Sequence, residues 1–496
     1  MRVTVEAQRR AVSRVLDLEQ AGTSRSDASR SVASQAGLPV ARLERWLEDQ
    51  EALARRNGGG SRRDRSPRAR WSQRPGLRPV AILRSATAGI TALAVGADVM
   101  LKFPITTTTV LSVLLLPVWL PRLRRYRGAT TVVAFGVVAL LAGWTIAELT
   151  TQHVIDPKLA QSTAVGVLSA LGAVGLLLWV RSALGVETMA LIVGVGMLVA
   201  VGLDGFSPIN AWKYQLSLPV TTIVLAVVAR WRQPVLSAAA LVLLAVVGLA
   251  FDSRSYAGFC VLTAAVMLWQ AFPSAVAGQA RSAWHRVQMG MLLVLAITGA
   301  GAIGQQLLVG GALGEEVAAR SQAQVTAGGG SLLVGGRPEM QATISLVPSQ
   351  PWGFGLGAVP NQEDVLLAKQ GMAKVGIQPG NGYVDHYMFG GHIELHSIIA
   401  DLWASCGVVG AAFGLAMAFL LLDALLADAV SRRASAQSVF WVASAVWFLG
   451  FGPLYTNMPD VAFALAVALT PAVVAHRRRK RTTSWSPLHT TPPLNP

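Results

Sequence analysis

The sequence predicts an all-α, polytopic membrane protein with about twelve transmembrane helices, one large extracytoplasmic loop and a small N-terminal helical unit. Of the 496 residues, 53% are hydrophobic and only 14% are charged, whereas soluble domains carry about 25% charged residues. A spanning helix needs about 20 mostly apolar residues, and such stretches recur from Ala81 to Ala475. The mean hydropathy of +0.48 fits the same class.

Short polar or basic breaks divide the apolar part of the chain into twelve predicted spans. They cover residues 84–101, 105–120, 129–148, 159–180, 187–203, 213–230, 234–251, 256–272, 288–310, 397–424, 437–452 and 458–475. Only Lys102, Phe103 and Pro104 separate the first two. Scattered glycines are common in membrane helices, where neighbouring helices satisfy the backbone.

The distribution of arginine predicts the orientation, because short loops rich in Lys and Arg stay in the cytoplasm. The connections at 121–128, 181–186, 231–233, 273–287 and 425–436 all contain arginine, as does the C-terminal flank. The loops 149–158 and 204–212 hold one cation, Lys158. With an even number of spans, both termini of this multi-pass protein face the cytoplasm. The formal net charge of +16 is therefore mainly a topology signal.

The N-terminal unit, residues 1–54, is predicted to hold three short helices in the cytoplasm. Its apolar positions recur at helical spacing at Val12, Val15, Leu16 and Leu18 and again at Val40, Leu43, Trp46 and Leu47, with a second helix over 26–36. The segment resembles the helix-turn-helix of transposase accessory proteins. Because a fold does not imply a function, a helical cap or protein-binding module is preferred, and binding of nucleic acid is the alternative.

Residues 55–80 follow as a basic linker with nine arginines, a composition that predicts disorder and attraction to anionic membrane lipid. The transmembrane domain is expected over 81–476 and a cytoplasmic tail over 477–496. No apolar core of a cleavable signal peptide lies near the start. Cys260 and Cys406 fall in predicted spans and are expected to be packing residues.

The loop 311–391 is much longer than the other connections. Loops beyond about 12–15 residues are usually functional or disordered. This one contains aromatic residues, namely Trp352, Phe354, Tyr383, Tyr387 and Phe389. Residues 315–324 and 364–374 fit short amphipathic helices. We therefore predict an ordered cap on the outer membrane surface.

Three of the seven histidines, His386, His392 and His396, lie near the end of this loop, with Glu394 among them. His and Glu can bind zinc. On a helix, however, only His392 and His396 would share a face, and Glu394 would point away. We expect no metal site and no cofactor here, and surface histidines are the plainer alternative.

Two arginines are expected on the same outer side. Arg254 follows the seventh span, against the positive-inside trend, and Arg337 lies in the loop. A local ion pair between Arg254 and Asp252 is one interpretation. The other is an anion site, because guanidinium groups bind phosphates in a bidentate way and two of them fit a pyrophosphate.

Several short motifs share this side of the predicted topology. They are Ser253-Arg254, Gly336-Arg337 ahead of Pro351–Gly357, His396-Ser397 ahead of Cys406–Gly410, and Pro208–Lys213. In their order, together with the helix count and the late outer loop, the chain resembles the O-antigen ligase and O-antigen polymerase superfamily. Ser397 departs from the family's usual asparagine, and Ile209 interrupts its Asn-Pro order.

The resemblance implies metal-independent transfer of a glycan from an undecaprenyl-pyrophosphate carrier to an acceptor hydroxyl on a glycan or lipid. His396 would be the general base or would orient the acceptor, and Arg254 and Arg337 would hold the pyrophosphate. A positioned histidine suits deprotonation of a hydroxyl, and fixed positive charge suits a pyrophosphate leaving group. Additional contacts to substrate are expected from His392, Glu394, Tyr387 and Trp352. Ligase and polymerase are not distinguished.

Two other classes remain open. A secondary transporter or an exporter of a surface-glycan precursor would suit twelve spans, but such proteins show internal repeats and ionisable residues at the membrane midplane. No repeat is visible, and the candidate acidic residues lie mostly near predicted span ends, at Asp98, Glu148, Asp401 and Asp423. A membrane-anchored regulator acting through residues 1–54 is the third class.

Overall fold

The computed structural model describes residues 24–36, 78–272, 314–376 and 382–472, with scattered positions between 15 and 47 and between 305 and 311. The chain divides into two units, Met1–Arg84 and Ser85–Pro496. The described residues form seventeen α-helices and one short β-hairpin. The linker up to residue 77, the predicted span 288–310 except for a few residues near its end, and the tail 477–496 lie outside the described residues.

The first unit contains α2 (Arg25–Ala36), which matches the helix predicted over 26–36. The apolar stripes on either side of it also adopt helical backbone where the structure describes them. A small core joins the three segments through the buried residues Val15, Ala28, Val32, Ala33, Leu43 and Leu47. The N-terminal stripes are therefore the inner faces of one compact helical unit.

The second unit is built from helices of very different lengths. Before the cap these are α5 (Arg78–Ala97), α6 (Thr107–Leu114), α7 (Leu116–Leu123), α8 (Ala129–Leu149), α9 (Pro157–Leu184), α10 (Val186–Asp204), η2 (Trp212–Leu216), α11 (Ser217–Val228), η3 (Ala229–Trp231), α12 (Pro234–Ala250) and α13 (Arg254–Ala271). After the cap come α19 (Ile398–Val430), α20 (Ala436–Phe451) and α21 (Leu454–Ala468).

Five helices of the described part are long and apolar enough to cross a membrane. They are Ala129–Leu149, Pro157–Leu184, Val186–Asp204, the continuous Trp212–Trp231 and Ile398–Val430. Ile82–Ala97, Pro234–Ala250 and Ala436–Phe451 are apolar but shorter. These helices make a multi-pass membrane protein the class that the structure supports.

The prediction of one continuous span over 105–120 is wrong. A hairpin of β1 (Met100–Lys102) and β2 (Ile105–Thr106) precedes two eight-residue helices, α6 and α7, which meet at Leu115. Pro117 lies in the first turn of α7 and Pro121 inside it. Proline has no backbone N–H and clashes with the preceding turn, so this segment does not continue as one helix.

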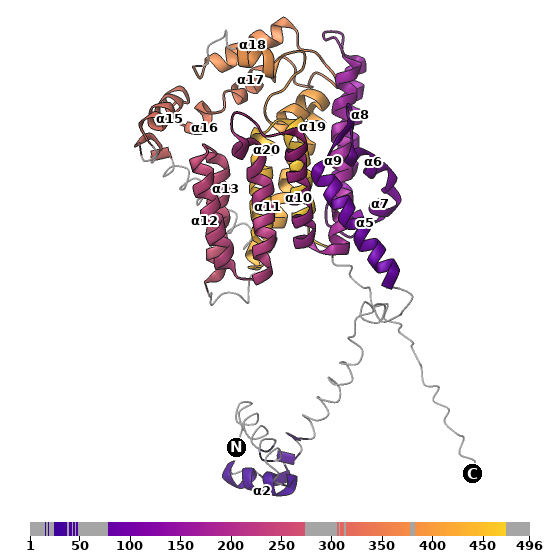
Figure 1. Cartoon of the computed structure of the whole chain (residues 1–496), viewed down its shortest axis with the longest axis vertical. Helices are drawn as coiled ribbons and strands as arrows, with labels where there is room; N and C mark the ends of the chain where they lie inside the picture. The colour runs from indigo at the N-terminus through magenta and orange to yellow at the C-terminus, as the bar shows by residue number, and fades with distance from the viewer. Residues whose placement is uncertain are drawn as a thin grey trace, which may run out of the picture. The chain divides into compact units, whose positions relative to one another are not determined.

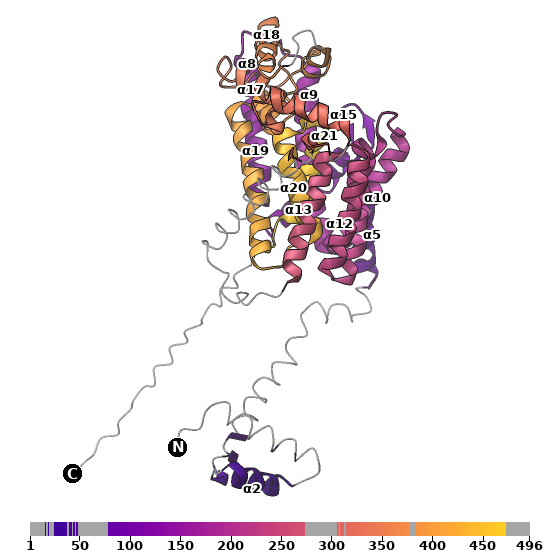
Figure 2. The ribbon, with the colours of Figure 1, turned by 90° about the vertical axis from the view of Figure 1, so that its left-hand side faces the viewer.

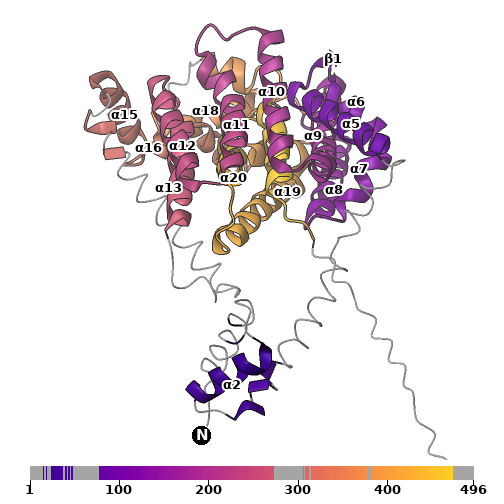
Figure 3. The ribbon, with the colours of Figure 1, turned by 60° about the horizontal axis from the view of Figure 1, so that its bottom comes forward.

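The helices of the second unit pack around α9, α19, α20 and α21 (Figure 3). α8 lies along α19, α12 lies along α13, and α9 contacts α6, α7 and α21. Aromatic rings fill the contact between α20 and α21, where the centroids of Trp441 and Phe463 are 4.7 Å apart at nearly right angles. Both side chains are almost fully buried, so this contact belongs to the hydrophobic core.

One end of this bundle gathers the arginine-rich connections. Arg181, near the end of α9, donates to the carbonyl oxygens of Ala466 and Leu469 at 2.8 Å each. The backbone of Arg127 donates to Thr470 at 3.0 Å. We call this the arginine end. It lies away from the cap helices, at the C-terminal ends of α11, α13 and α19 (Figures 1 and 2).

The other end carries the cap, which consists of α15 (Glu315–Ala327), α16 (Leu332–Gly335), α17 (Glu339–Leu346), α18 (Gln362–Ala373) and η4 (Tyr383–Met388) (Figure 1). The helices expected at 315–324 and 364–374 are thus present. The cap has its own hydrophobic core, which includes Leu346, Phe354, Met372, Val384 and Met388 and extends to Trp403 of α19. We call this the cap end.

The glycine-rich segment 351–357 anchors the cap by inserting between α8 and α19. Gly407 interrupts α19 with φ 66°, and the carbonyl of Ala404 accepts hydrogen bonds from the backbone of Phe354 at 2.8 Å and Gly355 at 3.1 Å. Backbone approaches backbone so closely that a Cβ on Gly353 would lie 2.3 Å from the Trp403 carbonyl oxygen. The segment therefore requires glycine for its positive φ and for space.

Gly353→Ala should destabilise the protein more than Gly185→Ala. Both glycines have a positive φ, 81° and 87°, but nothing lies within 4 Å of a Cβ at Gly185. The Gly185 variant bears the backbone cost alone, on the order of 1 kcal/mol. The Gly353 variant must also displace packed backbone, which adds roughly 1–3 kcal/mol. Thermal unfolding in detergent, followed by tryptophan fluorescence, measures both, and equal midpoints would contradict this account of the insertion.

Candidate functional site

The segment that joins the cap to α19 brings His392, Glu394 and His396 together. Nε2 of His392 lies 3.8 Å from one oxygen of Glu394, and Nε2 of His396 lies 3.6 Å from the other. The expectation that Glu394 would point away from the histidines is wrong, because it assumed a helix and this segment is irregular. The carboxylate therefore lies between two imidazoles.

His396 is held in an unusual backbone conformation, with φ 52°. Non-glycine residues rarely occupy this left-handed region, and such strain persists only where the surroundings enforce it. The neighbouring backbone provides that restraint, since Leu395 donates to Asp401 at 2.6 Å and the Ser397 hydroxyl caps α19. Nε2 of the ring faces Glu394, and the buried Nδ1 has no hydrogen-bond partner among the described residues.

Tyr383 connects His396 to the loop arginine. Its ring centroid lies 5.6 Å from that of His396, and its hydroxyl donates to Glu339 at 2.7 Å. Burial and then the Glu339 carboxylate raise the pKa of the Tyr383 phenol, so it stays protonated as a donor, while the nearby Arg337 opposes the shift. This contact therefore joins the cap helices to the histidine.

Arg337 is fixed by aromatic rings. Its guanidinium carbon lies 5.2 Å from the ring centroid of Trp447 and 5.7 Å from that of Phe451, both on α20. Cation–π contacts of this kind favour keeping a guanidinium near the rings. We call Arg337, Glu339, Tyr383, Glu394 and His396 the histidine cluster.

Arg254 lies in a different neighbourhood, at the start of α13. Its Nε is 3.2 Å from Asp252, and Nη1 donates to Ser321 of α15 at 3.2 Å. The expected local pair with Asp252 is thus present. The same carboxylate also lies 3.5 Å from Arg320 and 3.9 Å from Lys213. Three cations around one carboxylate leave an excess of two positive charges, and we call these four residues the cationic cluster.

A cleft of about 480 Å³ lies between residues 207–212 and the end of α12, and of the cationic cluster only Asp252 lines it. Asn210 and Asp252 line it. Asn210 donates to the Phe251 carbonyl at 2.7 Å and accepts from the Lys213 backbone at 2.9 Å. The motif 208–213 therefore shapes this cleft and brings Lys213 to the carboxylate that Arg254 contacts.

The remaining candidate residues lie in different parts of the structure. Tyr387 stacks near Tyr383, with ring centroids 6.0 Å apart, and is exposed. Trp352 is exposed on the inserted segment. Cys260 and Cys406 are buried free thiols. No group of three or more His, Cys, Asp or Glu in the described ranges is arranged to hold a metal ion.

Two buried carboxylates support the site, and the sequence did not reveal their roles. Asp401 accepts from the backbone of Leu395 at 2.6 Å and of Leu454 at 2.9 Å. Asp364 of α18 lies 2.8 Å from His153 in the connection between α8 and α9. Asp401 was ambiguous in the sequence because it lies near the start of a span, and His153 is a lone residue with no motif around it.

Comparison with protein-family models, with curated proteins and with solved structures finds no match to this chain. The arrangement itself offers three chemical elements. One is an imidazole with an acidic partner and an unpartnered nitrogen. The second is an arginine within cation–π distance of two aromatic rings. The third is a cationic cluster at the start of α13 and on α15, whose Asp252 lines a cleft; α15 and the start of α13 lie at the cap end of the bundle (Figure 1).

Asp401→Asn should destabilise the protein by about 1–3 kcal/mol. The asparagine can accept only one of the two backbone hydrogen bonds, and its amide nitrogen would face the other N–H. Asp204→Asn is the matched control, because Asp204 is exposed at the end of α10. Thermal unfolding midpoints test the difference. A midpoint as high for Asp401→Asn as for the control would remove Asp401 from this role.

The contact between His392 and Glu394 should stabilise the fold more at low pH. Glu394 raises the pKa of His392, and burial opposes it. A histidine whose pKa is raised on folding contributes stability that is fully present below about pH 6.5 and is lost as the pH rises through the folded pKa. Near pH 6 the free energy of unfolding of the wild type should exceed that of His392→Gln, but by less than about 1 kcal/mol, because the pair is partly exposed. A difference that stays constant up to about pH 9 would contradict this.

Proposed function

We propose that this protein transfers a glycan from an undecaprenyl-pyrophosphate carrier to an acceptor hydroxyl at the outer face of the cytoplasmic membrane. This is the activity that the resemblance to the O-antigen ligase and polymerase superfamily implies. The observation that carries the proposal is the geometry of His396, whose Nε2 faces Glu394 at 3.6 Å while Nδ1 has no partner within the described residues. A base oriented by a carboxylate is a recurring arrangement in catalytic sites.

The reaction needs one proton acceptor and one group that stabilises the leaving charge. The acceptor oxygen bonds to the anomeric carbon of the donor sugar as the bond from that carbon to the pyrophosphate oxygen breaks. The acceptor's proton passes to His396, and undecaprenyl pyrophosphate leaves with the electron pair. A positioned base of this kind contributes typically about 10²–10⁴-fold to the rate.

Arg337 and the cationic cluster supply positive charge without a metal. A planar guanidinium fixed on the rings of Trp447 and Phe451 costs little reorganisation when negative charge develops on the pyrophosphate. Arg254 belongs to a cluster with an excess of two positive charges, which favours a bound anion. Tyr387 and Trp352 are exposed on the cap and are proposed to contact sugar rings, and His392 to contact substrate.

The proposal includes twelve membrane crossings, in which the segment 105–120 crosses as the two short helices α6 and α7, with both termini in the cytoplasm and the cap outside. Support comes from the separation of the two ends, because arginines of the short connections gather at the end away from the cap (Figures 1 and 2). That asymmetry follows the positive-inside rule. The donor's polyprenyl tail stays in the bilayer, so its pyrophosphate meets the protein at the membrane surface near the cap.

Purified wild-type protein in nanodiscs should transfer glycan from undecaprenyl-pyrophosphate-linked oligosaccharide to an oligosaccharide acceptor. His396→Ala should lower the rate about 100-fold or more, because the base is lost. Arg337→Lys keeps the charge but loses the fork and the stacking, so it should lower the rate about tenfold or more. The measurement is product formation with time, resolved by chromatography of labelled glycan.

Two controls keep the comparison matched. His386 is exposed on the cap and Arg230 is exposed at the arginine end, so His386→Ala and Arg230→Lys should retain activity. Equal transfer by wild type and His396→Ala would keep the activity but move the base elsewhere. Absence of transfer by folded wild type with several donors would reject the proposal in favour of a transporter or an exporter of a surface-glycan precursor.

A further inference from the structure

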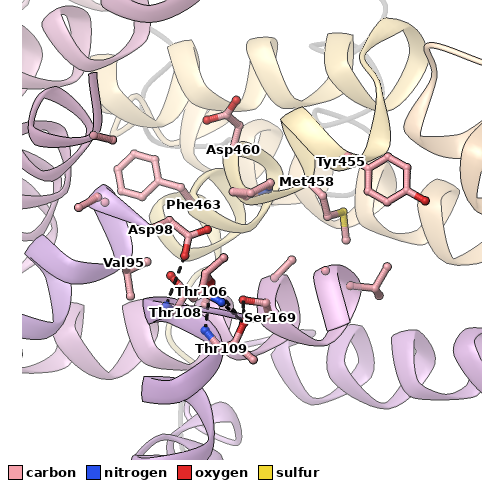
Figure 4. Close-up of a pocket in the computed structure, with 18 of the residues that line it drawn as sticks. Val95, Asp98, Thr106, Thr108, Thr109, Ser169, Tyr455, Met458, Asp460 and Phe463 are labelled. Carbon is pink, nitrogen blue, oxygen red and sulfur yellow. Dashed lines mark hydrogen bonds between the residues drawn. The ribbon is translucent and has the colours of Figure 1, made fainter. Parts of the chain in front are cut away.

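A second cavity, of about 340 Å³, lies within the bundle between the end of α5 and helices α6, α9, α10 and α21 (Figure 4). It is separate from the cleft that Asp252 lines, and the two share no lining residue. Its volume lies within the range of small-molecule sites, about 300–1,000 Å³, and greatly exceeds what a bare ion needs.

The lining of this cavity is mostly apolar, and its polar part offers oxygen atoms and, among the described residues, no cation. Its polar residues are Asp98, Thr106, Thr108, Thr109, Thr163, Ser169, Tyr455 and Asp460, and it contains no Lys, Arg or His among the described residues. Two carboxylates without a cation would repel a phosphate. Carboxylates and hydroxyls are instead suited to binding the hydroxyl groups of a neutral ligand.

One hydroxyl in the cavity has no partner. Thr108 is 3% exposed, and its Oγ1 makes no hydrogen bond in the part of the chain that the structure describes. Its backbone N–H donates to Asp98 at 3.3 Å, so the hydroxyl and the carboxylate form adjacent parts of one wall (Figure 4). Buried polar atoms are normally hydrogen-bonded, and a bound hydroxyl would satisfy this one.

The opposite wall comes from the first turns of α21 (Figure 4). Asp460 accepts from the Asn457 amide at 3.2 Å, and Phe463, whose ring also packs on Trp441 in the hydrophobic core, borders the same cavity. The Tyr455 hydroxyl is 2.6 Å from the hydroxyl of Thr163. A carboxylate next to an aromatic ring is a combination that suits a sugar, because the carboxylate binds hydroxyls and the ring covers the apolar C–H face.

This wall is coupled directly to the histidine cluster. The backbone N–H of Leu454, which lines the cavity, donates to one oxygen of Asp401, and the N–H of Leu395, next to His396, donates to the other. The cavity and the proposed base therefore lie on two sides of a single carboxylate.

We infer that this cavity binds a neutral, hydroxyl-rich saccharide through Thr108, Asp98 and Asp460. Resting on the proposed function, its role is to hold a sugar unit of the acceptor while the anionic donor occupies the cationic cluster. Saccharide binding itself does not depend on that function, so the two are tested separately.

Full-length protein in nanodiscs is titrated with the methyl glycosides of glucose, galactose and mannose and with N-acetylglucosamine, and binding is read by saturation-transfer NMR. Wild type should bind at least one of them. Thr108→Val and Asp460→Asn should each weaken binding about tenfold through a lost hydrogen bond. Thr263→Val is the control, because Thr263 is buried on α13 and its hydroxyl bonds only its own helix in the described structure.

Three results would overturn the inference. One is binding of none of the probes by folded wild type, and another is equal binding by wild type, Thr108→Val and Asp460→Asn. The third is a rise in melting temperature with sodium but not choline chloride that Asp460→Asn abolishes, which would make the cavity a cation site.

The transfer assay separates failure of this inference from failure of the proposed function. With an acceptor that contains the bound sugar, Thr108→Val should raise the acceptor KM about tenfold and change kcat less than KM. Transfer by wild type with an unchanged KM in Thr108→Val would overturn the acceptor role and leave the function intact. Sugar binding without any transfer would overturn the function and the acceptor role, and would leave the binding site.

Discussion

The carboxylate of Asp401 is the constraint on which the cap end depends. It is buried near the start of α19 and accepts from Leu395, the residue before His396, and from Leu454, the first residue of α21. The segment that leads into α19 and the start of α21, which are distant in sequence, therefore meet at the two oxygen atoms of this carboxylate. A buried carboxylate is stable only when its oxygens are satisfied, so the positions of these segments are coupled. The left-handed backbone of His396 is held by this coupling, because its neighbours on both sides are fixed.

The inserted segment 351–357 is the second device that makes the cap rigid. Its hydrogen bonds to Ala404 use a carbonyl that the break at Gly407 makes accessible, so the kink in α19 and the insertion require each other. His153 and Asp364 add a buried link between α18 and the α8–α9 connection. These contacts make the long loop a structured layer. The strained backbone of His396 persists because the contacts around it fix its conformation.

Hydrophobic length predicted the long helices well, because the apolar runs at 129–148, 159–180, 187–203, 213–230 and 397–424 recur as helices with similar bounds. The prolines of α7 divide the segment 105–120 into two helices, and a hydropathy average does not detect such a break. Within the site, residue types singled out three histidines and two arginines, and the family resemblance selected His396 among the histidines, but assuming a helix at 392–396 put Glu394 on the wrong side. Glu339 and Asp401 were not assigned roles because each depends on a partner from a distant segment, Tyr383 and Leu454, and no local pattern encodes that.

The cationic cluster and the cavity at Thr108 differ in charge, and this difference bears on how one protein would distinguish two glycan substrates. The cationic cluster has an excess of two positive charges around Asp252, whereas the cavity at Thr108 has two carboxylates and no cation among its described lining residues. A pyrophosphate-linked donor would be attracted by the first and repelled by the second, and a neutral acceptor would lack the charge that the first selects. In the proposed reaction, specificity therefore comes partly from repulsion, because the acidic cavity keeps the donor's anionic group out of the acceptor's place.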